Sequence, residues 1–163
     1  MALFKPSVKK LEEEGDIAGL IKALTEDAHS ARHDDALHAL GRIGEPAAAP
    51  LIQALSVLPG RKYAIAGALG EIGKSAVEAL IRVLPSQNPA VRYGAAMALG
   101  RLKDATAMHA LIHALRLEHN HEAGYQEAYA ILSLGPVAVK PFVNELTQMM
   151  KRFRSQARHW WEN

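Results

Sequence analysis

The chain has 163 residues, of which 49% are hydrophobic and 22% are charged, and its formal net charge is +2. This length suffices for one domain with a buried core, and the charge lacks the strong basic excess of typical nucleic-acid-binding proteins. Cysteine is absent, which excludes disulfides, thiolate catalysis and Cys-ligated zinc. We find no signal peptide and no run of about 18 apolar residues, so we expect one cytoplasmic domain over 1–163.

Two short motifs alternate along the chain with a period of about thirty residues. The first begins at Gly19 as GLIKAL and recurs as PLIQAL, ALIRVL, ALIHAL and PFVNEL, starting at Pro50, Ala79, Ala110 and Pro141. The second ends at Gly44 as ALHALGRIG and recurs as AIAGALGEIG, AAMALGRL and EAYAILSLG, ending at Gly73, Leu102 and Gly135. Both motifs have helical periodicity, so we predict a chain of repeated helix pairs.

Caps and closing glycines divide this pattern into elements. In chain order, the predicted helices are 6–14, 16–25, 29–43, 46–56, 61–72, 75–84, 89–102, 105–117, 121–134 and 137 to about 160. We expect an N-terminal cap helix within 6–15, repeats over 16–44, 45–73, 74–103 and 104–135, and a C-terminal capping helix with a basic and aromatic tail over 136–163. Asn88 followed by Pro89 is typical of a helix start, and Gly44 of a helix end.

Each predicted helix has one apolar side. The first helix of a pair carries a stripe such as Leu20, Ile21 and Leu24, whereas the third residue of its motif varies and is expected to face water. Those variable residues are Lys22, Gln53, Arg82, His113 and Asn144. A single pair cannot bury its own stripe, so stacked copies must form the core. The predicted fold class is all-α, a right-handed α-solenoid (α-α superhelix) of about four to five helix-pair repeats.

The segment NPAVRYGAAMALGRLKDATAMHALIHAL, residues 88–115, resembles the HEAT-like repeat of the phycobilisome-lyase (PBS lyase) type. The resemblance extends over about 16–146. It implies an armadillo-type (ARM/HEAT-like) fold with the second helices on the concave face, and a function as an interaction scaffold or as a subunit of a chromophore lyase. The chain departs from the pattern at the Arg92 position, where His33 and Gly124 stand in two other repeats.

Tyrosines recur at one register of the second helices. Tyr63, Tyr93 and Tyr125 lie opposite the apolar stripe, and Tyr129 follows Tyr125 by one helical turn. Met97, His38 and Asp34 are expected beside them, and Lys62 and Arg92 form a short basic row. Two interpretations stay open here: the tyrosines pack between neighbouring helices, or they form an exposed recognition surface.

The C-terminal segment is the other unusual stretch. Phe142, Leu146, Met149, Phe153, Ala157 and Trp160 continue one apolar stripe, which predicts a helix of more than twenty residues. Basic residues accompany it at Lys151, Arg152, Arg154 and Arg158, and Trp161 follows Trp160. The helix can cap the solenoid, bind a partner or a second copy, or lie on a membrane surface; Phe153, Arg154, Trp160 and Trp161 are the candidate partner or self-association residues.

Several histidines lie close together in the sequence and could suggest a metal site, but their positions in the repeat motif argue against one. His109 and His113 are one turn apart, and His121 and Glu122 follow them, but His113 occupies the variable, water-facing position. A di-metal hydroxylase of the HEAT type would need four His-Glu pairs, and this chain offers two approximate ones. The candidates His109, His113, His121 and Glu122 therefore give no metal site in our prediction, and we expect neither a cofactor nor catalytic residues.

The prediction is a non-catalytic scaffold or adaptor that binds a protein or peptide on the concave face. An acidic partner is favoured by Lys62 and Arg92. A chromophore (bilin) lyase-type or chaperone subunit is the main alternative, by resemblance; nucleic-acid binding and a metal-dependent hydroxylase are lesser ones. We expect no membrane partner, and the C-terminal helix offers a route to a homodimer.

Overall fold

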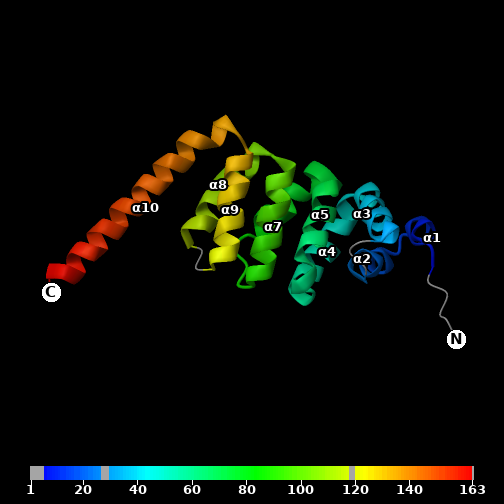
Figure 1. The fold of residues 1–163 in the computed structure, drawn as a ribbon. Helices are drawn as coiled ribbons and strands as arrows, with labels where there is room; N and C mark the ends of the chain where they lie inside the picture. The colour runs from blue at the N-terminus through cyan, green and yellow to red at the C-terminus, as the bar shows by residue number, and fades with distance from the viewer. Residues whose placement is uncertain (1–5, 27–29, 118–119, 163) are drawn as a thin grey trace.

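A computed structural model describes residues 6–26, 30–117 and 120–162; for residues 117, 149 and 152–162 it describes the backbone alone. Within these ranges the regular structure is entirely helical (Figure 1), which confirms the predicted all-α class. The helices are α1 (Val8–Glu13), α2 (Ile17–Glu26), α3 (Ala31–Ile43), α4 (Glu45–Val57), α5 (Lys62–Ile72), α6 (Val77–Val83), α7 (Pro89–Leu102), α8 (Met108–Leu117), α9 (His121–Ser133) and α10 (Pro136–Glu162).

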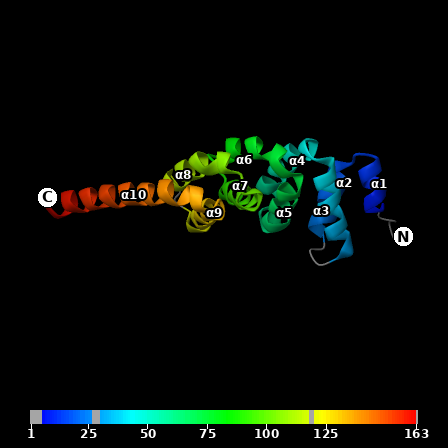
Figure 2. The same cartoon turned by 90° about the horizontal axis from the view of Figure 1, so that it is seen from above.

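The helices form two layers of a solenoid. The first helices of the pairs, α2, α4, α6 and α8, make one layer, and the second helices, α3, α5, α7 and α9, make the other (Figure 2). Short 3-10 turns at Pro59–Arg61, Gly73–Ala76 and Ala105–Ala107 precede three of the helices. The predicted bounds therefore agree with the structure to within a few residues, while the right-handed twist and the number of repeats stay predictions.

Local chemistry explains where the helices begin and end. The Asn88 side chain accepts a hydrogen bond from the backbone N–H of Ala90, and Pro89 occupies the first position of α7, where its missing N–H costs nothing. At the end of α7, Lys103 adopts a left-handed φ of 52° where two other second helices end at a glycine with positive φ. Gly44, with φ of 75°, is one of those glycines.

The core lies between the two layers. Leu20, Leu51, Leu80 and Leu111 from the first helices and Leu40, Leu69 and Leu99 from the second helices have no exposed surface. The variable residues of the first helices, Lys22, Gln53, Arg82, His113 and Asn144, are all exposed. Both findings confirm the predicted faces, and burial of the leucine stripes supplies the main driving force for stacking.

Glycines set the spacing of the second helices. A Cβ atom on Gly41 would lie 2.8 Å from Cβ of Glu71 in the next second helix, and one on Gly100 would lie 3.1 Å from Cα of Ala130. Consecutive second helices touch along much of their length, whereas consecutive first helices touch at few points. The closely packed second helices therefore lie on the inner side of the curve.

The solenoid changes at its C-terminal end. Leu132 occupies the α9 position that is glycine in the three preceding second helices, and its side chain is 57% exposed. The chain then continues as the 27-residue α10, which packs its first turns against α8 and α9 and extends away from the body (Figure 1). In the described part of the chain, no helix combines the length and apolar character needed to span a bilayer.

Candidate binding face of the second helices

The tyrosines divide into exposed and buried members. Tyr63 on α5 is 57% exposed, and Tyr125 and Tyr129 on α9 are 68% and 57% exposed. Tyr93 on α7 is only 3% exposed. Of the two interpretations left open by the sequence, packing between helices therefore applies to Tyr93, and an exposed surface applies to the other three tyrosines.

Two side chains of α5 cover the ring of Tyr93 on α7. The Lys62 ammonium from α5 lies 4.1 Å from the centroid of the Tyr93 ring, a cation–π distance. The Tyr63 ring meets Tyr93 edge-on, with centroids 5.7 Å apart and planes at 79°. Burial, followed by the neighbouring Tyr63 hydroxyl, raises the pKa of Tyr93 well above its ordinary value.

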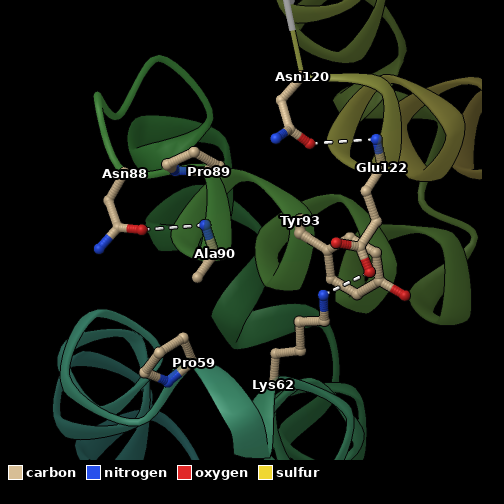
Figure 3. Close-up of a pocket in the computed structure, with 8 residues that line it drawn as sticks. All are labelled: Pro59, Lys62, Asn88, Pro89, Ala90, Tyr93, Asn120 and Glu122. Carbon is tan, nitrogen blue, oxygen red and sulfur yellow. Dashed lines mark hydrogen bonds and ion pairs between the residues drawn. The ribbon is translucent and has the colours of Figure 1, made fainter.

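An ion pair that skips one repeat completes this arrangement. Nζ of Lys62 lies 2.5 Å from Oε1 of Glu122 in the first turn of α9, so the pair links α5 to α9 across α7 (Figure 3). The Lys62 side chain is 17% exposed and that of Glu122 is 58% exposed. The lysine is thus fixed beneath the surface, and the carboxylate approaches it from the solvent side.

An open pocket of about 310 Å³ surrounds this ion pair, where the second helices α5, α7 and α9 begin. Its lining residues are Pro59, Lys62, Asn88, Pro89, Ala90, Tyr93, Asn120 and Glu122 (Figure 3). Asn88 caps α7, and Asn120 caps α9 by accepting hydrogen bonds from the N–H groups of Glu122 and Ala123. The caps hold the walls of the pocket in place, and its charged groups are Lys62 and Glu122.

Arg92, and His33 at the equivalent position of the first repeat, contact backbone carbonyl groups. Nη1 of Arg92 donates a hydrogen bond to the carbonyl of Ser86 at 2.7 Å. Nδ1 of His33 lies 2.7 Å from the carbonyl oxygen of Leu24. His33 therefore ties the start of α3 to α2, and Arg92 ties the start of α7 to the turn that follows α6. Arg92 and Lys62 therefore do not act together as the short basic row that the sequence predicted for an acidic partner.

The remaining residues predicted beside the tyrosines have separate roles. His38 is exposed, with Nδ1 3.7 Å from Oε2 of Glu71, and Nη2 of Arg101 lies 3.8 Å from the other oxygen of the same carboxylate. Asp34 is exposed, and Met97 is partly buried against the core. The charged side chains along the later turns of α3, α5 and α7 therefore include both acidic and basic groups.

The histidines of the metal hypothesis are spread over the surface. His109 and His113 are exposed on α8 in the outer layer, and His121 is exposed at the start of α9. Glu122 binds Lys62. Across residues 6–26, 30–117 and 120–162, no three or more His, Cys, Asp or Glu side chains gather as a metal site would require.

Sequence reasoning missed the role of Glu122 opposite Lys62. The two residues are 60 positions apart, which is two repeat periods. A comparison of charges two periods apart, instead of one, could have found the pair. The side chains of Phe153, Arg154, Trp160 and Trp161, predicted as partner residues on α10, lie outside the described residues.

Comparison with known proteins agrees with the solenoid. A family model described as HEAT repeats matches residues 59–135, whereas the comparison with curated proteins returns no match. The finer resemblance to the phycobilisome-lyase type stays a prediction. The matched segment runs from the turn before α5 to the end of α9 and contains every residue of the pocket around Lys62. Over these residues the chain is similar to HEAT repeats, in sequence and in its paired helices.

Proposed function

We propose that the protein is a non-catalytic scaffold or adaptor that binds a peptide segment of a protein partner across the first turns of α5, α7 and α9. The observation that carries this proposal is the exposure of Tyr63 and Tyr125, at equivalent positions on either side of the buried Tyr93. Tyrosine contributes a large contact area with little ordering cost and is enriched at interfaces. Stacked helical repeats provide extended concave surfaces of this kind.

The chemistry of the pocket favours an acidic segment. Lys62 is held in place by Tyr93, so it loses little freedom when it binds a carboxylate. Glu122 occupies that carboxylate position in the free protein, from the solvent side. A glutamate or aspartate of the partner would replace Glu122 on Lys62, while apolar or aromatic side chains of the partner cover Tyr63 and Tyr125.

The test is selection of peptides from a random display library on the full chain, followed by affinity measurement with labelled peptides. The informative variant carries Tyr63→Ala and Tyr125→Ala and leaves the buried Tyr93 intact. We expect at least a tenfold loss of affinity, because each exposed tyrosine is a candidate hot spot worth about 1 kcal/mol or more.

The matched control carries two alanines on the outer layer, Lys22→Ala and Gln53→Ala, at exposed positions of α2 and α4. This control is expected to bind with unchanged affinity. Equal affinity of all three proteins for every selected peptide, with the tyrosine variant folded, would contradict the proposal.

A further inference from the structure

The long helix α10 has two apolar stripes, and its own chain covers one of them. Toward the body, Ala138 is buried and Phe142 is partly buried, and Glu145 on the same side binds Nε of Arg116 on α8 at 2.9 Å. The neighbouring stripe consists of Val139, Val143, Leu146 and Met150, which are 39% to 60% exposed.

The exposed stripe has the spacing of a coiled-coil seam. Val139, Val143, Leu146 and Met150 follow one another at intervals of four, three and four residues, and the sequence continues the interval pattern with Phe153, Ala157 and Trp160. Apolar residues alternating at three and four along one helix match the seam of two paired helices. This stripe extends over three heptads, although a capping helix needs no apolar residues beyond the end of the body.

The geometry of α10 leaves room for a second helix along this seam. At 1.5 Å per residue, its 27 residues span about 40 Å, and its C-terminal half extends away from the solenoid (Figures 1 and 2). We propose that α10 pairs with α10 of a second copy of this chain, antiparallel, so that the exposed stripe of Val139, Val143, Leu146 and Met150 in each copy lies against the C-terminal half of α10 in the other copy.

Charge selects the antiparallel orientation. Residues 136–150 contain one lysine and one glutamate and have no net charge, whereas residues 151–162 contain four basic residues and one glutamate, a net charge of +3. A parallel pair would place the two basic halves side by side. An antiparallel pair places each basic half beside a neutral half, which removes that repulsion.

The pairing is isologous, with the same surface contributed by both copies, so it closes as a two-fold dimer. The seam lies on α10, outside the pocket around Lys62, so this inference is independent of the proposed peptide-binding function. Its consequence for that function is bivalency, because one dimer would present two second-helix faces.

Sedimentation equilibrium of the full chain at micromolar concentration tests the pairing. The expected mass is twice the 17.7 kDa of one chain. The variant with Val143→Glu and Met150→Glu is expected to sediment at the monomer mass with unchanged helix content by circular dichroism. The control with Asn144→Glu and Lys151→Glu, on another side of the same helix, should remain a dimer. A wild-type monomer at 100 μM, or a seam variant that stays dimeric, would overturn the inference.

Disulfide trapping tests the orientation, because the native chain has no cysteine. A mixture of Val139→Cys and Trp160→Cys chains should form the mixed disulfide, and Val139→Cys alone should not form a homodisulfide. The reverse result would indicate parallel helices and contradict the proposed pairing. A chain that is monomeric and sediments with phosphatidylserine vesicles through α10 would likewise overturn the proposed pairing, in favour of a membrane-surface role for the helix.

Discussion

The Lys62 ammonium lies 2.5 Å from the Glu122 carboxylate, which belongs to the second helix two repeats further along the chain. The ring of Tyr93, from the helix between them, lies 4.1 Å below the same ammonium. Three successive second helices are therefore joined at one point. Lys62, Tyr93 and Glu122 also line the pocket, so the contact between the three helices and the proposed peptide site share the same side chains.

The first prediction concerns Lys62. Lys62→Met keeps the length of the side chain and removes its charge, and it should lower the free energy of unfolding by about 1–2 kcal/mol, since it removes a partly desolvated cation–π contact and an ion pair. Urea denaturation measures the change. Lys22→Met, which removes an exposed ion pair with Glu26 on α2, should change the stability by less than about 0.5 kcal/mol. Equal effects of the two substitutions would refute the structural role of Lys62.

Helix spacing is tested with two glycines of the second helices. Gly41→Ala would place its Cβ 2.8 Å from Cβ of Glu71, so we expect a net destabilisation of about 1–2 kcal/mol in spite of the helix propensity of alanine. In Gly67→Ala, the new Cβ would meet Cδ1 of Leu37 at 3.4 Å, an ordinary contact. That variant should be more stable than wild type by about 0.5–1 kcal/mol. Thermal unfolding of both proteins distinguishes this account from one in which all helical glycines are equivalent.

Acid stability should depend on Glu12 and Arg42. Hydrogen bonds from Nε and Nη2 of Arg42, at 2.6 and 2.7 Å, lower the pKa of Glu12 below its ordinary value of 4.5. Because the folded-state pKa is lowered, the stabilisation from this pair is present above the ordinary value and is lost as the pH falls through the lowered value. In a carbon-13 NMR titration, Arg42→Gln should move the Glu12 midpoint upward. An unchanged midpoint would show that the ion pair does not persist in solution.

Alkaline stability should depend on Tyr93. Burial, and then Tyr63, raise its pKa in the folded state above the ordinary value of 10.0. The unfolded chain therefore releases this proton first, so stability is fully present below pH 10 and declines as the pH rises further. Tyr93→Phe should lose less stability than wild type between pH 9.5 and about 11. The exposed Tyr129→Phe serves as the control and should follow the wild-type curve.

The repeats made most of the fold predictable. Leucine stripes, alanine-rich second helices and caps such as Asn88 all gave the same helix boundaries, because each local signal agreed with the period. Exposure of the variable residues, His113 among them, followed from the same register. The order of the helices and the position of the core therefore needed no information beyond the sequence.

The site was less predictable because it depends on contacts between repeats. Tyr63, Tyr93 and Tyr125 are equivalent in sequence, but Tyr93 alone is buried, since Lys62 precedes it and Glu122 follows it at the right distances. A residue's own helical face cannot show what neighbouring repeats place over it. The exposed second stripe of α10 was also hidden, because the sequence does not show which side of that helix meets the body.

Tyr63 and Tyr125, together with the pocket around Lys62, make up the proposed peptide-binding face. The chain has only four tyrosines, so carbon-13 labelling of tyrosine rings yields a small, assignable set of NMR signals. Titration with the tightest peptide from the display selection is predicted to shift the Tyr63 and Tyr125 signals in proportion to occupancy. A peptide that binds while both signals stay unmoved would contradict the account.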